Sequence, residues 1–265
     1  MGRRLLAAHA LVVYAFLYAP VAVVVVYAFN GGRQTLNWEG FSTRWFGAAL
    51  RDDSITDALR NSLLIAAGNA VVACVLGTLL ALSLPRMWRA LRVPIDALVT
   101  MTLVTPEIVF GIAALVFFTQ IGLTLGLGTI LVAHVVFNAS VVALVVRARF
   151  VGLGLEFEEA SFDLGAGPLS TFRQVTLPRL APAILAGGLL AFTFSFDDFY
   201  TSFFVSGAGT TTLPLYVFSS LRFGVSPIVN AVAAMVLALT VAAVVLAYAV
   251  LRRSGGRPGG VLPLR

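Results

Sequence analysis

Two apolar stretches of this chain each carry acidic residues next to aromatic ones. The first contains Thr105-Pro106-Glu107, and the second contains Ser195-Phe196-Asp197-Asp198, with Tyr200 close behind. A charged side chain at membrane depth costs about 2.5–3.5 kcal/mol on insertion scales, so such residues mark functional positions. An ammonium group that is desolvated against an aromatic face gains about 0.5–2 kcal/mol. These residue types therefore predict a cavity that attracts an organic polycation.

Helical geometry predicts that the acids lie at similar depth. A rise of ~1.5 Å per residue puts Glu107 about 18 Å from Ile95 and Asp197 about 26 Å from Leu180. Both positions fall in the outer half of the expected membrane spans. Asp197 and Asp198 point about 100° apart on a helix, so one is expected to face the cavity and the other a neighbouring helix.

Each of these side chains also has a simpler interpretation. Glu107 can pair with an arginine or cap a helix that is broken at Pro106. The phenylalanines are more often packing residues than recognition residues. His134 and Asn138 are spaced i, i+4 in an apolar run, which favours an interhelical hydrogen bond over a proton relay. Cys74 is expected to be a small core residue.

A charged segment at 147–179 separates two of the apolar stretches. The half before Gly165 contains acidic residues, and the half after Gly165 contains apolar and basic residues. We expect two short helices, with Gly165 turning the chain between them and Pro178 ending the second. Phe157, Phe162, Leu164 and Leu169 supply an apolar face that can insert into a partner's groove. The alternative is an amphipathic loop lying on the inner leaflet.

The composition is that of a membrane protein. The 265 residues are 59% hydrophobic and 11% charged, whereas soluble chains carry about 25% charged residues. The formal net charge of +6 comes from arginines near helix ends rather than from a basic patch with interleaved aromatic residues, which argues against a nucleic-acid partner. The first apolar run is too long for a cleaved signal peptide.

Six spans are expected, and the chain is interpreted as one transmembrane domain over residues 1–265. They cover Leu5–Phe29, Ser62–Leu84, Ile95–Ile121, Leu127–Val146, Leu180–Phe203 and Val229–Leu251. Five of the 18 arginines, namely Arg33, Arg44, Arg51, Arg60 and Arg222, lie on one side, and the remaining thirteen lie on the side of the termini. Both termini are therefore expected to be cytoplasmic.

The regions outside the spans are expected to differ in structure. In the external loop 30–61, helical spacing of Trp45, Phe46, Ala49 and Leu50 predicts an interfacial helix. The external loop 205–228 carries glycines and prolines that indicate turns. The tail 252–265 is expected to be disordered. The sequence contains no phosphate-binding loop and no metal-ligand cluster.

The 147–179 segment resembles the EAA signature of permease subunits of ABC importers. Its matching positions are Glu159, Ala160, Ser161, Gly165, Val175, Leu177 and Pro178, and Asp163 lies among them. Ser161 replaces the second alanine and Val175 replaces an isoleucine. The resemblance implies an all-α fold of the type I ABC importer permease (MetI-like) kind with six transmembrane helices. It also implies that these residues couple the chain to a cytoplasmic ATPase dimer.

Further stretches resemble the spermidine/putrescine (PotC/PotI-like) branch of these permeases. They include Thr105-Pro106-Glu107-Ile108-Val109, the run from Leu190 to Phe199, and Thr212-Leu213-Pro214-Leu215. Glu107 departs from the more usual aspartate. The resemblance implies a bacterial inner-membrane location, polyamine cargo, a second six-span permease and an external substrate-binding protein. It implies that ATP and Mg are bound by the partner ATPase and that this chain binds no cofactor.

Three other interpretations remain open. Related permeases carry ferric iron, opines or aminophosphonates. An ion-coupled carrier would use the intramembrane acids as ion ligands, but inverted repeats that favour a carrier are absent from the sequence. An intramembrane enzyme would need a nucleophile–base pair or a metal cluster, and none is evident.

Overall fold

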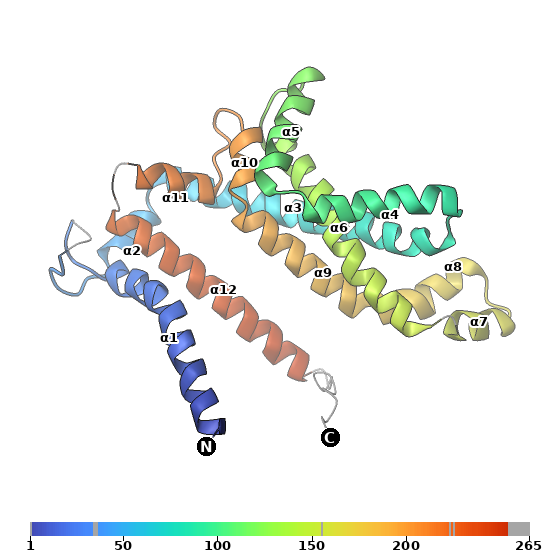
Figure 1. The fold of residues 1–265 in the computed structure, drawn as a ribbon. Coiled ribbons are helices and arrows are strands. Elements are labelled where there is room, and N and C mark those ends of the chain that lie inside the picture. Colours follow the sequence, from blue (N-terminus) through green and yellow to red (C-terminus); the bar gives the residue numbers. More distant parts are fainter. Residues whose placement is uncertain (1, 34–36, 155, 223, 225, 254–265) are drawn as a thin grey trace. The chain divides into compact units, whose positions relative to one another are not determined.

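The computed structural model describes residues 2–33, 37–154, 156–222, 224 and 226–253 (Figure 1). The described residues form helices joined by turns and loops, with an isolated β-bridge between Asn30 and Phe41. They divide into two compact units. The first unit is Met1–Thr56 with Val217–Arg265, and the second unit is Asp57–Tyr216.

The first unit pairs the two ends of the chain. It contains α1 (Gly2–Ala28), α2 (Arg44–Ala49) and α12 (Pro227–Arg253). Ala28 at the end of α1 packs against Ala231 of α12, with Phe46 of α2 beside them. The side chains along the rest of α1 are mostly exposed and apolar. Such a surface is suited to lipid rather than to water.

The second unit is built around three long helices. These are α3 (Asp53–Ser83, which begins in the first unit), α6 (Leu127–Leu153) and α9 (Leu177–Asp197). α6 packs along α9, as Figure 1 shows. Their shared core consists of Ala73, Ala81, Leu82, Val142, Val146, Phe150, Leu180 and Ala191. Small residues let these helices approach closely, as is common in membrane bundles.

Among the described residues, four or five apolar helical segments are of spanning length, where six spans were expected. Four helical segments are long and apolar enough to cross a membrane: Arg4–Ala28, Asp53–Arg86, Leu127–Leu153 and Pro168–Asp197. The bent helix pair Arg89–Val104 and Glu107–Gln120 makes a fifth if the two helices are one span, and the apolar part of α12 at Pro227–Ala242 is shorter than these. The tail predicted to start at residue 252 lies, beyond Arg253, outside the described residues.

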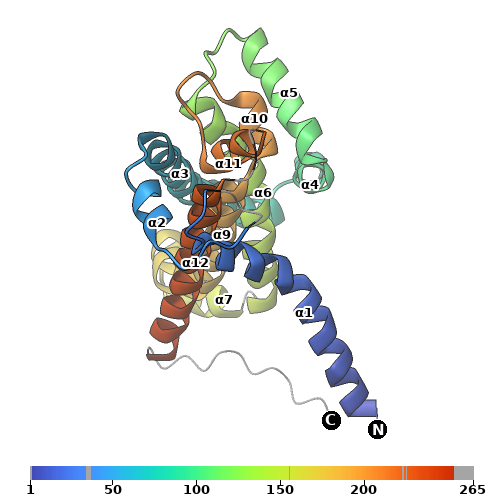
Figure 2. The ribbon, with the colours of Figure 1, turned by 90° about the vertical axis from the view of Figure 1, so that its left-hand side faces the viewer.

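The third expected span is broken rather than straight. α4 (Arg89–Val104) and α5 (Glu107–Gln120) meet at an angle of 115°. Figure 2, which views α4 end-on, shows α5 leaving it steeply. Thr105 and Pro106 are extended, with ψ of 128° and 134°. A proline disfavours helical geometry in the residue before it, so the helix stops at Val104.

The fifth expected span ends earlier than predicted. α9 stops at Asp197, and a separate short helix, α10 (Tyr200–Val205), follows. Asp198 leaves the helical region with ψ of 119°. Its carboxylate instead accepts the backbone N–H of Ser202 in α10, at 2.8 Å. The prediction that Asp197 and Asp198 sit on one helix was therefore wrong.

The remaining helices lie at the ends of the spans. A helix is present where an interfacial one was predicted, as α2, although Leu50 follows its last residue. The second external loop contains α11 (Leu213–Leu221), and η1 (Leu84–Arg86) follows α3. α6 continues to Leu153, past the predicted end at Val146.

The 147–179 segment contains the predicted turn between two helical parts. α7 (Glu156–Asp163) precedes Gly165, which has φ of +82°, and α8 (Pro168–Thr171) follows. The second part does not end at Pro178 as expected. A π-helical turn, η2 (Phe172–Thr176), runs directly into α9. A proline in the first turn of a helix lacks only an N–H that would be unpaired anyway, so Pro178 is tolerated there.

Candidate functional site

A cavity of about 230 Å³ lies where α5, α6, α9 and α10 meet, and we call it the acidic cavity. Its lining residues are Glu107, Phe110, His134, Phe137, Asn138, Phe194, Asp197, Asp198, Phe199, Tyr200 and Thr201. The lining thus combines three carboxylates with five aromatic rings and includes no arginine. The two helix breaks bring the acids together, because Glu107 begins α5 and Asp197 ends α9.

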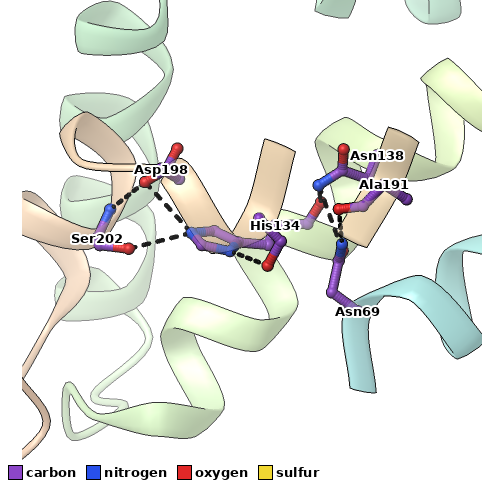
Figure 3. Close-up of polar contacts among 7 residues, drawn as sticks. Asn69, His134, Asn138, Ala191, Asp198 and Ser202 are labelled. Atoms are coloured by element: carbon purple, nitrogen blue, oxygen red, sulfur yellow. Dashed lines mark hydrogen bonds and ion pairs between the residues drawn. The ribbon is translucent and has the colours of Figure 1, made fainter. Parts of the chain in front are cut away.

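Asp198 is held by hydrogen bonds inside the fold. Its Oδ1 lies 3.3 Å from Nε2 of His134 on α6 and accepts the backbone N–H of Ser202 (Figure 3). Its side chain is only 13% exposed. Asp198 therefore contacts a neighbouring helix, as expected for one acid of the pair, but it also lines the acidic cavity together with Asp197.

His134 joins three segments of the second unit. Its Nδ1 lies 2.7 Å from the hydroxyl of Ser195 on α9, and its Nε2 lies 3.2 Å from that of Ser202 on α10. Because an ionised carboxylate can only accept hydrogen bonds, the imidazole donates from Nε2 to Asp198. The predicted interhelical hydrogen bond is confirmed, and the serines are partners that sequence reasoning did not identify.

A second polar group crosses the helices beside His134. Asn69 of α3 donates its amide to the carbonyl oxygen of Ala191 on α9, at 2.8 Å. Asn138 of α6 donates to Oδ1 of Asn69 at 3.4 Å and to the carbonyl oxygen of His134 at 3.0 Å. Figure 3 shows both amides between the three helices. Asn69 was not singled out from the sequence, although an asparagine in a long apolar run is the usual signal for such a bond.

Glu107 and Asp197 remain exposed at the acidic cavity. Neither carboxylate pairs with an arginine within the described residues. Tyr200 lines the cavity as predicted, with 43% of its surface exposed. Phe196 lies outside the lining and stacks on Phe192 instead, with ring centroids 6.0 Å apart. Unpaired carboxylates beside aromatic faces can receive a cation.

The 147–179 segment is tied to the rest of the second unit through Glu158. Its Oε2 accepts a bond of 2.9 Å from Nη2 of Arg86, and its Oε1 accepts a bond of 2.7 Å from the hydroxyl of Thr176. Ser161 and Thr171 join α7 to α8 through their hydroxyls, 2.9 Å apart. These contacts connect α7 to the end of α3 and to the start of α9.

The residues of the predicted coupling motif are spread along this segment. Glu159, Ala160, Asp163, Gly165 and Pro178 are exposed, whereas Ser161, Val175 and Leu177 are half-buried. A groove of about 580 Å³ opens beside them; its lining includes Arg86, Phe150, Glu158, Glu159, Phe162, Thr171 and Thr176. The segment therefore presents both a surface and a groove to solvent.

The four apolar residues predicted to form a face of this segment are all exposed. Leu164 and Leu169 are 89% and 79% exposed. Phe162 and Phe157 are 47% and 44% exposed, and the guanidinium carbon of Arg179 lies 3.2 Å from the ring centroid of Phe157. The two leucines are suited to insertion into an apolar groove of another protein, since nothing in the described chain covers them.

An ion pair that sequence reasoning missed joins α4 to α6. Asp96 and Arg147 are in direct contact through Oδ1 and Nη1. Asp96 lies in the middle of α4, and its position in a predicted span was the signal for such a partner. In the part of the chain that the structure describes, no group of three potential ligand side chains is placed to hold a metal ion.

The chain is similar to membrane subunits of known transport systems. Residues 73–255 match the model of the family described as binding-protein-dependent transport system inner membrane component. The chain is 44% identical over 231 residues to the putrescine transport system permease protein PotI of Escherichia coli (strain K12), covering 84% of this chain and 82% of the relative. It is 36% identical over 243 residues to the spermidine/putrescine transport system permease protein PotC of Haemophilus influenzae, covering 92% and 95%.

A solved structure shares the fold. It is a chain of a bacterial alginate ABC transporter, solved in complex with an alginate pentasaccharide-bound periplasmic protein. The TM-score is 0.70 at 17% sequence identity, covering 97% of this chain and 96% of that chain. At this identity the likeness concerns the fold alone.

Proposed function

The chain belongs to the binding-protein-dependent transport system inner membrane component family, and we propose that it is the permease subunit of an ATP-driven ABC importer of polyamines. In this assembly it forms half of the translocation pathway for putrescine or spermidine. The similarity to PotI and PotC, over most of this chain and of each relative, supports the polyamine cargo.

The acidic cavity is the single observation that carries the choice of a cationic cargo. Glu107, Asp197 and Asp198 line it without an arginine to neutralise them. A linear polyamine carries several ammonium charges on apolar methylenes, so carboxylates and aromatic walls match both parts of it. We assign Glu107, Asp197 and Tyr200 to contact with the cargo. Asp198 shapes the site through His134.

Energy for import is proposed to come from a partner. The chain binds no cofactor in this proposal, and ATP and Mg belong to a cytoplasmic ATPase dimer that grips the 147–179 segment. The exposed motif residues Glu159, Asp163 and Gly165 and the exposed Leu164 and Leu169 supply the contact surface. Because Glu158 bonds to both Arg86 and Thr176, movement of α7 would be passed to α3 and α9.

The other partners follow from the same assembly. A second six-span permease completes the pathway, and an external substrate-binding protein delivers the cargo. The excess of arginines near the termini and the 147–179 segment supports cytoplasmic termini. The site then opens toward the outer half of the membrane.

The test is labelled putrescine uptake by vesicles that contain the complete assembly. Glu107→Gln and Asp197→Asn are expected to lower the maximal uptake rate by about 10- to 100-fold each, since each removes a charge-assisted contact worth ~1.5–3 kcal/mol. Asp57→Asn, at an exposed acid outside the cavity, serves as the control. If both cavity variants transport like the parent, the carboxylates do not bind the cargo. Uptake that persists with an inactivated ATPase would identify an ion-coupled carrier instead.

A further inference from the structure

Asn138 presents an unpaired hydrogen-bond acceptor at the acidic cavity. Its side chain is 2% exposed, and its Oδ1 has no hydrogen-bond partner among the described residues. Asn138 also lines the acidic cavity. Leaving a buried acceptor unsatisfied costs the desolvation of that atom, so native proteins rarely retain one without a partner.

The orientation of the Asn138 amide follows from its neighbours. Both groups within reach of Nδ2 are acceptors: Oδ1 of Asn69 at 3.4 Å and the carbonyl oxygen of His134 at 3.0 Å. Turning the amide over would set its oxygen against these two oxygens. Oδ1 must therefore point away from them, as Figure 3 shows.

The other buried side-chain oxygens without a partner in the described chain lie elsewhere. They belong to Thr78 and Thr212, and neither residue lines the acidic cavity. Asn138 is thus distinguished by having both an unsatisfied oxygen and a place in the wall of a cavity. A mobile donor that enters this cavity would satisfy it.

Asn138 lies at a different position along the acidic cavity from Glu107 and Asp197. It follows His134 by one helical turn on α6, about 6 Å further toward the end that carries Arg147. Glu107 and Asp197, by contrast, are exposed at the two helix breaks. A cation drawn in by the carboxylates would therefore meet a neutral oxygen beyond them.

We propose that Oδ1 of Asn138 accepts an N–H from the leading ammonium group of the polyamine after the cavity carboxylates have drawn it in. This inference rests on the proposed function and adds a specific inner contact to it. A metal cation is a poorer match, since hard cations require about six or more oxygen ligands. An ammonium group needs only one acceptor for each N–H, and the aromatic lining can face its remaining surface.

The test compares two buried asparagines that share one hydrogen bond. Asn138→Leu removes the cavity acceptor together with the bond to Asn69. Asn69→Leu removes that same bond and the bond to Ala191, but Asn69 does not line the cavity. Both variants are assembled with the ATPase, the second permease and the binding protein in vesicles. We measure membrane content, ATP hydrolysis, and the KM and maximal rate of putrescine uptake.

Asn138→Leu is expected to lower the maximal uptake rate by about tenfold relative to Asn69→Leu. KM should stay unchanged, because the binding protein captures the cargo first. An equal loss of uptake rate in both variants would show that Asn138 only packs helices. A parental uptake rate in Asn138→Leu would show that water satisfies the oxygen. Either result overturns the inference. If the parent assembly takes up no putrescine, the proposed function itself has failed.

A structure of the parent assembly with putrescine bound provides a second measurement that needs no variant. An ammonium nitrogen at about 2.7–3.2 Å from Oδ1 of Asn138 supports the inference. A bound putrescine whose nitrogens both contact other groups, with water at Oδ1, overturns it even where Asn138→Leu fails to assemble.

Discussion

Nε2 of His134 lies 3.3 Å from Oδ1 of Asp198, and this contact joins α6 to the link between α9 and α10. The link exists because Asp198 leaves α9 and accepts the N–H of Ser202. The same imidazole also reaches the hydroxyl of Ser195 on the last turn of α9. One histidine thus holds the wall of the acidic cavity at the point where the helix is interrupted.

Replacing His134 by phenylalanine should destabilise the protein and reduce transport. Asp198 would lose its hydrogen bond from the imidazole, and a hydrogen bond to a charged group contributes about 1.5–3 kcal/mol. A lower melting temperature in detergent and weaker putrescine uptake are the expected results. His9→Phe is the control, because His9 is exposed on α1. Parental stability of His134→Phe would contradict a holding role.

Replacing Gly165 should impair the protein because of the backbone conformation at this residue. Its φ is +82°, and a Cβ added there would meet nothing within 4 Å. Left-handed geometry costs a residue with a side chain about 1–2 kcal/mol. Gly165→Val is therefore expected to abolish uptake while the protein remains in the membrane, and Gly165→Asn should retain more activity, since asparagine tolerates this region better.

Gly167→Ala provides the matched control for that experiment. Gly167 lies two residues further along, has φ of −74°, and is equally open to an added Cβ. Its substitution should leave uptake and ATP hydrolysis at parental levels. If Gly165→Val also transports normally, the turn between α7 and α8 does not transmit movement from the ATPase.

The Arg86–Glu158 pair should matter more for coupling than for stability. The Arg86 side chain is 55% exposed and the Glu158 side chain 14% exposed. Because solvent reaches the guanidinium, we expect the pair to contribute about 0.2–1 kcal/mol, as exposed pairs do. Arg86→Gln and Glu158→Gln are expected to melt near the parent but to hydrolyse more ATP for each putrescine imported. Glu156→Gln, at an exposed acid of the same helix that forms no ion pair among the described residues, is the control. An unchanged ratio in both variants would remove the pair from the coupling path.

Gly77 sets the distance between α3 and α6. A Cβ added there would lie 2.7 Å from the carbonyl oxygen of Ala139 and 2.7 Å from Cβ of Val142. Overpacking of this kind typically costs about 1–3 kcal/mol, so Gly77→Ala should lower the melting temperature measurably. Gly68→Ala tests the same helix pair where the nearest atom is the Leu131 side chain at 3.4 Å, and little change is expected. Equal melting of the two variants would show that the helices can separate freely.

Much of the site could be predicted from residue types. Carboxylates in apolar runs are costly, which singled out Glu107, Asp197 and Asp198 before their contacts were known. The positive φ of Gly165 follows from a charged segment that must turn between two helices. Pro106 likewise indicated a disturbed helix, although the sequence did not predict an angle of 115°.

The sequence alone determined that the chain is helical, spans a membrane and carries acids inside it, because hydropathy and charge act through local composition. It did not determine which acid is free. That choice depends on partners distant in the chain: His134 engages Asp198, whereas Asp197, one residue earlier, stays exposed. Nor did the pattern reveal that Asn138 turns its oxygen away from Asn69, since two acceptors supplied by the packed helices decide that orientation. Such directional contacts arise only when the tertiary structure brings the groups within hydrogen-bonding distance.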